Sequence, residues 1–178
     1  DEPALGGARQ MQGKELSYNN IVDIDAALQL ALEFADPAVV IIKHTNPSGV
    51  GLSKRRPVDA FKKARECDPV SAYGGVIGFN RPVGADAARE IAATFFEAVI
   101  APGFDKAARK ILSAKANLRL LETGGEFRRG KQSGYEMKKV SGGLLLQSRD
   151  RHVLNPSDLK VVTKRAPTAD ELEALRFA

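Results

Sequence analysis

Short apolar runs alternate along the chain with segments whose apolar residues recur at helical spacing. The runs that predict buried strands are residues 38–43, 76–79, 98–101 and 118–121. Apolar residues three or four positions apart predict helices in residues 24–34, 57–67, 85–95 and 105–112. Strands that alternate with helices form βαβ units, so the pattern predicts an α/β fold with a mainly parallel sheet.

The pattern is less regular at the two ends of the chain. Residues 16–21 are polar and turn-forming, which puts the N-cap of the first helix at Asp23 or Asp25. Towards the C-terminus, the pattern predicts a strand at residues 135–140 with a partner strand at residues 142–147. It also predicts a last short strand at residues 161–165 and a final helix that begins at Pro167 and Thr168. That helix stops in mid-pattern and the first residue is not methionine, so we expect a piece of a longer protein.

The composition fits an ordinary globular domain with a sizeable core. The chain has 178 residues, of which 43% are hydrophobic and 28% charged. No apolar run approaches the roughly 20 residues that a membrane span needs, so we expect no membrane partner. The single cysteine, Cys67, cannot form an internal disulfide, which favours the cytoplasm. One cysteine and two distant histidines, His44 and His152, argue against a zinc site.

Residues 43–49, Lys-His-Thr-Asn-Pro-Ser-Gly, place chemistry at the end of a strand. The last four of them predict a rigid turn, so Lys43 and His44 should end a buried, central parallel strand, where open α/β sheets bind ligands. An imidazole can accept a proton near neutral pH, and a nearby lysine favours the neutral imidazole and can stabilise an oxyanion. The alternative is structural: Lys43 extends to solvent and His44 only hydrogen-bonds the next loop.

Residues 68–80, Asp-Pro-Val-Ser-Ala-Tyr-Gly-Gly-Val-Ile-Gly-Phe-Asn, form the second distinctive stretch. The paired glycines Gly74 and Gly75 let the backbone approach a ligand closely, or simply form a bend. They are not a dinucleotide fingerprint, because they lead into a strand and do not open a helix.

Several motifs together resemble the bifunctional AICAR transformylase/IMP cyclohydrolase family of purine biosynthesis. Residues 43–49 match its Lys-His-x-Asn-Pro-x-Gly signature, and residues 68–80 resemble its Ser-Ala-Phe-Gly-Gly region with Tyr73 in place of the usual phenylalanine. Residues 10–20, 140–145 and 161–165 resemble further family segments, so the resemblance covers nearly the whole chain.

This resemblance implies transfer of a formyl group from the cosubstrate 10-formyltetrahydrofolate to the 5-amino group of AICAR. It implies that His44 accepts the amine proton and that Lys43 orients His44 and stabilises charge. Gly74 matches a backbone position against the nucleotide, and Glu97 matches a carboxylate that holds a ribose hydroxyl or the base. The other expected substrate-binding residues are Asn46, Ser71 and Tyr73.

The resemblance also implies a fold and partners. The family's transformylase consists of two cytidine-deaminase-like, three-layer α/β/α halves, with its active site across a homodimer. The zinc signature of the deaminases is missing here, so no metal is expected in this half. Residues 1–178 are expected to be the N-terminal half of the transformylase domain, without the cyclohydrolase domain and the C-terminal half, and inactive in isolation.

Two other classes of function remain open. The net charge of +5 and the basic residues 54–56, 62–63 and 128–129 would suit a nucleic-acid-binding module. RNA-binding modules usually combine basic with aromatic residues, and only 6% of this chain is aromatic, so we expect no nucleic-acid partner. The other alternative is an inactive structural fragment.

Overall fold

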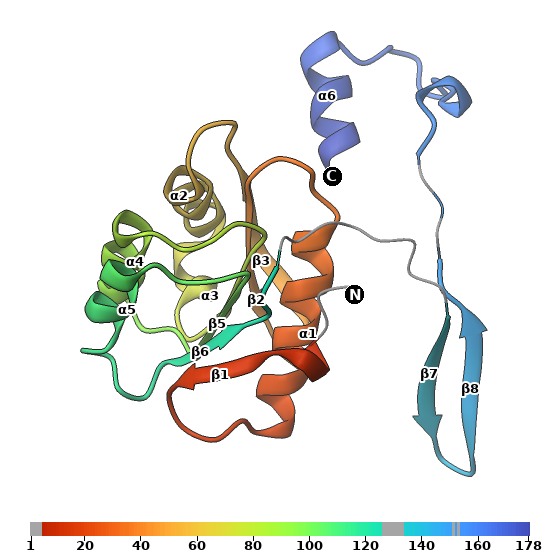
Figure 1. The fold of residues 1–178 in the computed structure, drawn as a ribbon. Coiled ribbons are helices and arrows are strands. Elements are labelled where there is room, and N and C mark those ends of the chain that lie inside the picture. Colours follow the sequence, from red (N-terminus) through yellow and green to blue (C-terminus); the bar gives the residue numbers. More distant parts are fainter. Residues whose placement is uncertain (1–4, 126–133, 151, 153) are drawn as a thin grey trace. The chain divides into compact units, whose positions relative to one another are not determined.

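The computed structural model describes residues 5–125, 134–150, 152 and 154–178 (Figure 1). The chain divides into two compact units, Asp1–Gln132 and Ser133–Ala178. Among the described residues, the first unit contains a six-stranded sheet with its helices, and the second contains a two-stranded sheet and one α-helix.

Helices and strands alternate through most of the first unit. After a short 3-10 helix at Leu5–Gly7, its strands are β1 (Arg9–Gln12), β2 (Ala38–Lys43), β3 (Asn46–Leu52), β4 (Val76–Phe79), β5 (Ala98–Ala101) and β6 (Arg119–Glu122). Its α-helices are α1 (Tyr18–Leu32), α2 (Pro57–Cys67), α3 (Pro69–Ala72), α4 (Ala85–Ala92) and α5 (Lys106–Leu112). The strands and helices expected from the central part of the sequence are therefore confirmed, whereas strands β1 and β3 and the short helix α3 were not predicted.

The sheet is mixed, with the strand order β1-β6-β5-β4-β2-β3. Only β4, β5 and β6 run parallel, whereas β2 is antiparallel to both of its neighbours and β1 is antiparallel to β6. The predictions of a mainly parallel sheet and of a parallel strand at residues 38–43 were therefore wrong. The reason is that β2 turns back directly into β3, a connection that only antiparallel strands permit.

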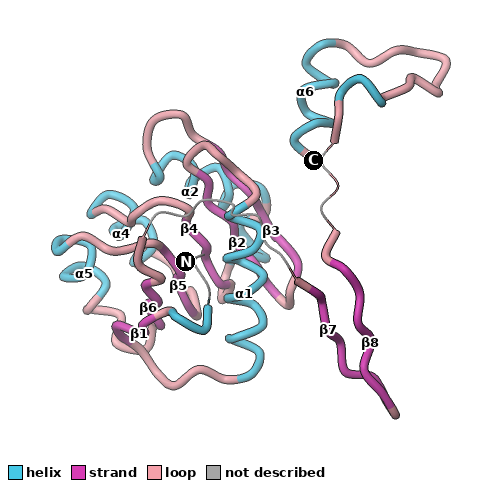
Figure 2. Tube along the Cα trace, turned by 45° about the vertical axis from the view of Figure 1, so that its right-hand side comes forward, coloured by secondary structure: helices cyan, strands magenta, loops and turns pink. Residues whose placement is uncertain are grey.

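Helices cover both faces of this sheet, as expected for three layers (Figures 1 and 2). Successive residues of β2 point to opposite faces: Val39 and Ile41 join the core with α2, α4 and α5, while Val40 and Ile42 join the core with α1. Since both faces are buried, the strand is apolar throughout and shows no polar alternation.

Residues 46–49 belong to strand β3 and not to the turn that was expected there. Pro47 is tolerated because β3 is the edge strand of the sheet and has an irregular register at this point. Gly49 and Gly51 are needed because a Cβ atom there would meet the carbonyl oxygens of Ala64 and Ala60 in α2. The glycines therefore let α2 pack directly against the strand.

Helix α1 begins earlier than the sequence suggested. Ser17 is its N-cap and forms a capping box with Asn20, in which each side chain accepts a hydrogen bond from the other residue's backbone N–H. The expectation of an N-cap at Asp23 or Asp25 was wrong, because both residues lie inside the helix.

A buried asparagine after β4 fixes the connection between α1 and β2. The Oδ1 atom of Asn80 accepts the N–H of Ala38 at 2.7 Å, and its Nδ2 donates to the carbonyls of Phe34 at 2.9 Å and Asp36 at 2.7 Å. Asn80 is only 1% exposed, so water cannot replace these three bonds.

The second unit contains the antiparallel strands β7 (Tyr135–Val140) and β8 (Gly143–Ser148), a 3-10 helix at Pro156–Asp158 and helix α6 (Ala169–Phe177). The strand pair and the final helix are confirmed, but residues 161–165 form no strand. Their β-branched residues favour a strand only where a neighbouring strand pairs with them. Thr168 caps α6 together with Glu171, and the hydrogen-bonded Arg165 lowers the pKa of Glu171 to about 2.

Candidate functional site

A two-residue turn, His44 and Thr45, joins β2 to β3. Lys43 pairs with Asn46 across this hairpin, and the two turn residues have φ angles of 53° and 64°. Two-residue hairpin turns need such positive angles and therefore usually contain glycine or asparagine. Each residue held in this region costs roughly 1–3 kcal/mol, a cost found mainly at functional sites, where surrounding contacts fix the backbone.

Side-chain hydrogen bonds hold this strained turn in place. The Asp23 carboxylate, from α1, accepts the Thr45 N–H at 2.7 Å. The carbonyl of His44 accepts the Asn46 side-chain amide at 2.9 Å and the Thr45 hydroxyl at 2.6 Å. The backbone of His44 is therefore fixed, while the residue itself is exposed in this chain.

The side chain of Lys43 reaches the loop that leads into β4. Its Nζ atom donates a hydrogen bond of 2.8 Å to the carbonyl of Tyr73. The next residue, Gly74, has a φ of 73°, and its N–H donates to the carbonyl of Phe95 at 2.9 Å. The structure therefore brings Lys43 next to Gly74, the glycine singled out from the sequence.

Ser71 lies in the short helix α3, in the same loop. Its backbone N–H donates to the Asp68 carboxylate at 2.9 Å, which caps α3. Hydrogen bonds from Ser71, together with the charge of Lys43, lower the pKa of Asp68. Lys43 thus has a carboxylate as well as a carbonyl oxygen in its surroundings.

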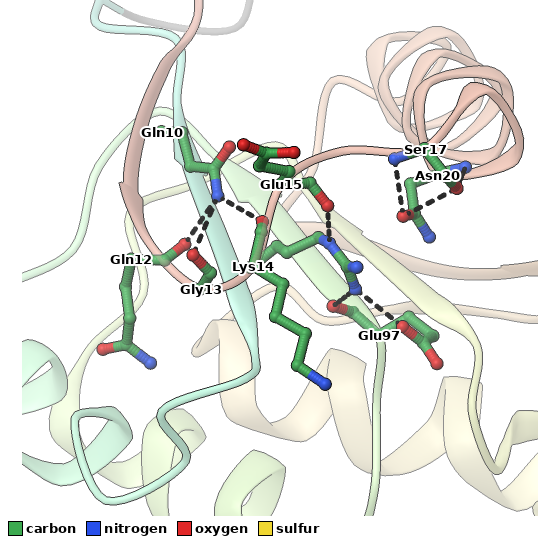
Figure 3. A network of polar contacts seen from close by, with 9 residues as sticks. Gln10, Gln12, Gly13, Lys14, Glu15, Ser17, Asn20 and Glu97 are labelled. Carbon is green, nitrogen blue, oxygen red and sulfur yellow. Dashed lines mark hydrogen bonds and ion pairs between the residues drawn. The ribbon is translucent and has the colours of Figure 1, made fainter.

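Glu97 stands directly before β5 and is tied down through both its backbone and its side chain (Figure 3). Its N–H donates to the carbonyl of Gly75 at 3.0 Å, and its carboxylate accepts from the Arg119 guanidinium at 2.7 Å. Arg119 also donates to the carbonyl of Glu15 at 3.0 Å. The Arg119 side chain is 11% exposed and that of Glu97 39% exposed, so the carboxylate is fixed but still open to solvent.

Strand direction explains why these residues gather. Because β2 is antiparallel to β4, Ile42 near the end of β2 pairs with Val76 at the start of β4. Val76 in turn pairs with Ala98 at the start of β5, which runs parallel to β4. The site therefore lies at the carboxyl end of β2 but at the amino ends of β4 and β5, whereas the sequence suggested the carboxyl ends of parallel strands.

Two exposed aromatic rings lie in the same region. The ring centroids of Tyr73 and Phe95 are 5.4 Å apart, and the two residues are 58% and 45% exposed. Phe95 also lies where a Cβ atom on Gly74 would be in van der Waals contact with its ring. The two rings thus present apolar surface beside the glycine loop.

Sequence reasoning missed three residues of this arrangement. Arg119 left a signal, since it is a charged residue at the first position of an apolar strand. Asp23 and Phe95 left none, because their partners lie 22 and 21 positions away along the chain and only the fold brings them together.

The basic residues of α2 and its N-cap are largely paired with carboxylates. Arg56 lies 2.7 Å from Asp59, and Lys62 lies 3.0 Å from Glu90. Lys62, with a smaller contribution from Arg65, lowers the pKa of Glu90. The basic residues 128–129 lie outside the described residues.

The described residues contain neither a cluster that could hold a metal ion nor a helix that could span a membrane. No group of three or more histidine, cysteine, aspartate or glutamate side chains there is arranged to hold a metal ion. None of the helices in the described ranges is both long and apolar enough to cross a membrane.

Comparison with known proteins gives a consistent result. A profile of the AICARFT/IMPCHase bienzyme family matches residues 1–178. The chain is 53% identical over 181 residues to a "Bifunctional purine biosynthesis protein PurH" of Parvibaculum lavamentivorans, and the match covers 100% of the chain and 33% of that relative. Proteins of the same name from an Anaeromyxobacter species and from Rhodospirillum rubrum are 50% and 52% identical, over 100% and 99% of the chain and 35% and 33% of their own lengths. The chain thus spans about a third of the curated relatives it matches. With the whole chain matched, it belongs to the AICARFT/IMPCHase bienzyme family.

Proposed function

We propose that this chain carries part of an active site that transfers a formyl group from 10-formyltetrahydrofolate to the 5-amino group of AICAR. The enzyme containing it would also be an IMP cyclohydrolase, through a domain outside these residues. The observation that carries the proposal is the position of Lys43, which ends β2 and donates to the Tyr73 carbonyl next to Gly74, with His44 directly after it in the chain.

The reaction needs a base, because the aromatic amine of AICAR is a poor nucleophile. The amine nitrogen attacks the formyl carbon, a C–N bond forms, and the carbonyl oxygen becomes an oxyanion. His44 takes the proton that the amine loses. When the oxyanion collapses, the bond from the formyl carbon to N10 of the folate breaks, and the imidazolium returns its proton to N10. The strained turn supports this role because it fixes the backbone from which the imidazole extends.

Lys43 would stabilise the oxyanion. An ammonium group has three donors, and one of them bonds the Tyr73 carbonyl at 2.8 Å. That bond anchors the positive charge, so two donors can serve the oxyanion without reorganisation during the reaction.

The other expected residues, apart from Asn46, would bind the nucleotide. Glu97 would accept hydrogen bonds from a ribose hydroxyl or the base, with its carboxylate fixed by Arg119. Gly74, which has no side chain, would let the nucleotide approach the backbone, and Ser71 and Tyr73 would line the same loop. Asn46 donates its side-chain amide to the carbonyl of His44, so its part would be to hold the turn.

We also propose the family's wider architecture for this protein. The order of helix α1, the β2–β3 hairpin and the following helix–strand units, with helices on both faces, supports a cytidine-deaminase-like fold. A second half and a homodimer would supply the rest of the site, including folate contacts. Residues 1–178 alone should therefore show little or no turnover.

The experiment is a formyl-transfer assay on the bifunctional enzyme to which we assign this chain. His44→Ala should lower kcat by about 10²–10⁴-fold, the usual worth of a positioned general base. His152→Ala is the matched control, because His152 is the other histidine of the chain and lies in the second unit. IMP cyclohydrolase activity should be unchanged in both variants. Near-normal transfer by His44→Ala would contradict the proposal.

A further inference from the structure

We propose that Asp23 is a positioning residue for His44, acting through the strained turn that joins β2 to β3. The inference rests on the proposed function, because it assigns Asp23 to the same proton transfer. It assigns no contact between Asp23 and the substrate.

The first support is the conformation of the turn. His44 and Thr45 are the only described residues other than glycine with positive φ. Threonine is especially unfavourable there, because its branched Cβ crowds the backbone. Such a conformation persists only when its surroundings impose it, so some contact must hold these two residues.

The second support is the contact itself. The Thr45 N–H donates to the Asp23 carboxylate at 2.7 Å, a short, charge-assisted hydrogen bond. Because the bond reaches the second residue of the turn, it fixes the peptide that links His44 to Thr45. The direction in which the imidazole leaves the backbone depends on that peptide.

The third support is the rigidity of the helix that carries Asp23. Ile24, Ala27 and Leu28 of α1 are 0% exposed and belong to the core on that face of the sheet. Helix α1 packs against β2 and β4, so Asp23 is held relative to the strand that ends at Lys43 (Figure 2). The turn is therefore hydrogen-bonded to a helix whose inner face is packed in the core.

The position of Asp23 within α1 shows that its carboxylate does not serve as a helix cap. It lies inside α1, where the backbone donors are already bonded within the helix, and the cap of α1 is provided by Ser17. The Asp23 carboxylate is therefore not needed to start the helix. Its described bond is to a residue 22 positions away, at the proposed catalytic turn.

The test compares four variants of the bifunctional enzyme in the formyl-transfer assay. Asp23→Ala should lower kcat about 10- to 100-fold, the scale expected when a catalytic group is misplaced by about 1 Å, while KM for AICAR stays within about twofold. Asp23→Asn should keep at least about half of kcat, because an amide oxygen accepts the same N–H. Asp25→Ala, an exposed acid two positions along the same helix, is the matched control and should behave as the unaltered enzyme.

The fourth variant separates positioning from general stability. Glycine adopts positive φ without strain, so adding Thr45→Gly to Asp23→Ala should restore most of the lost kcat. Asp23→Ala with unchanged kcat, or a double variant without recovery, would overturn the inference. If Asp23→Ala does not fold, the Asp23→Asn variant is the test, and a loss of kcat above tenfold in that variant would contradict the inference.

His44→Ala, assayed in parallel, keeps this inference separate from the proposed function. If His44→Ala lowers kcat at least about 100-fold and Asp23→Ala leaves kcat unchanged, only the role of Asp23 is wrong. If His44→Ala is active, the proposed chemistry itself fails.

Discussion

Replacing Arg119 by leucine should weaken both the fold and the binding of AICAR. Arg119 is largely buried and donates to the Glu97 carboxylate at 2.7 Å and to the Glu15 carbonyl at 3.0 Å. Leucine fills similar space but makes neither bond. The Glu97 carboxylate would then lose its partner and adopt several orientations.

The expected loss of stability depends on how far the Glu97 side chain is exposed to solvent. A hydrogen bond to a charged group is worth about 1.5–3 kcal/mol. Glu97 is 39% exposed, so water compensates part of the loss, and we expect the free energy of unfolding to fall by about 2 kcal/mol. For a chain of this size, that corresponds to a fall in Tm of about 4–8 °C.

Two quantities are measured for each variant: the Tm of thermal unfolding and the KM for AICAR in the formyl-transfer assay. Arg109→Leu is a matched control, because Arg109 donates to Glu122 at 3.0 Å and to the Phe104 carbonyl at 3.1 Å, at the other end of β6. Both variants should lose stability, but only Arg119→Leu should raise KM, by about tenfold, which corresponds to one lost hydrogen bond of about 1.4 kcal/mol. An equal KM in the two variants would refute the role of Arg119 in holding Glu97.

Three further predictions concern the fold. Asn80→Ala leaves the buried backbone groups that bond Asn80 without a partner, so the free energy of unfolding should fall by about 3 kcal/mol. Urea denaturation measures this change, and a fall of less than about 1 kcal/mol would contradict the prediction. Gly51→Ala pushes a Cβ atom into the Ala60 carbonyl and should cost about 2 kcal/mol, whereas Gly7→Ala, with open space around it, should cost little. The pKa of Glu171 is held at about 2, below its ordinary 4.5, so its stabilisation of α6 is complete above pH 4.5 and is lost as the pH falls through 2. An NMR titration of Glu171 with a midpoint near 4.5 would show that the cap does not form.

Local patterns in the sequence were enough to predict most elements of the first unit. Strands β4, β5 and β6 are short apolar runs, and α2, α4 and α5 show helical spacing. The direction of β2 could not be predicted, because a strand buried on both faces is apolar whether its neighbours are parallel or antiparallel. The hairpin turn was missed because Asn46, Pro47 and Gly49 are typical turn residues, yet the fold uses them in an edge strand that packs closely against α2.

The candidate site was only partly predictable. Lys43, His44, Gly74 and Glu97 could be identified because they belong to recognisable motifs or stand at strand ends. The contacts that hold them depend on residues far away in sequence, such as Arg119, 22 positions from Glu97. Such contacts follow from the packing of the sheet, which short-range patterns do not determine.

The most direct test of the proposed site is a crystal structure of the bifunctional enzyme with AICAR bound. We expect the 5-amino group within hydrogen-bond distance of the His44 imidazole, with Lys43 beside it and Glu97 on a ribose hydroxyl or the base. The nucleotide would then lie at the carboxyl end of β2 and the amino ends of β4 and β5. AICAR bound away from this edge, with no contact to His44, Lys43 or Glu97, would contradict the central claim.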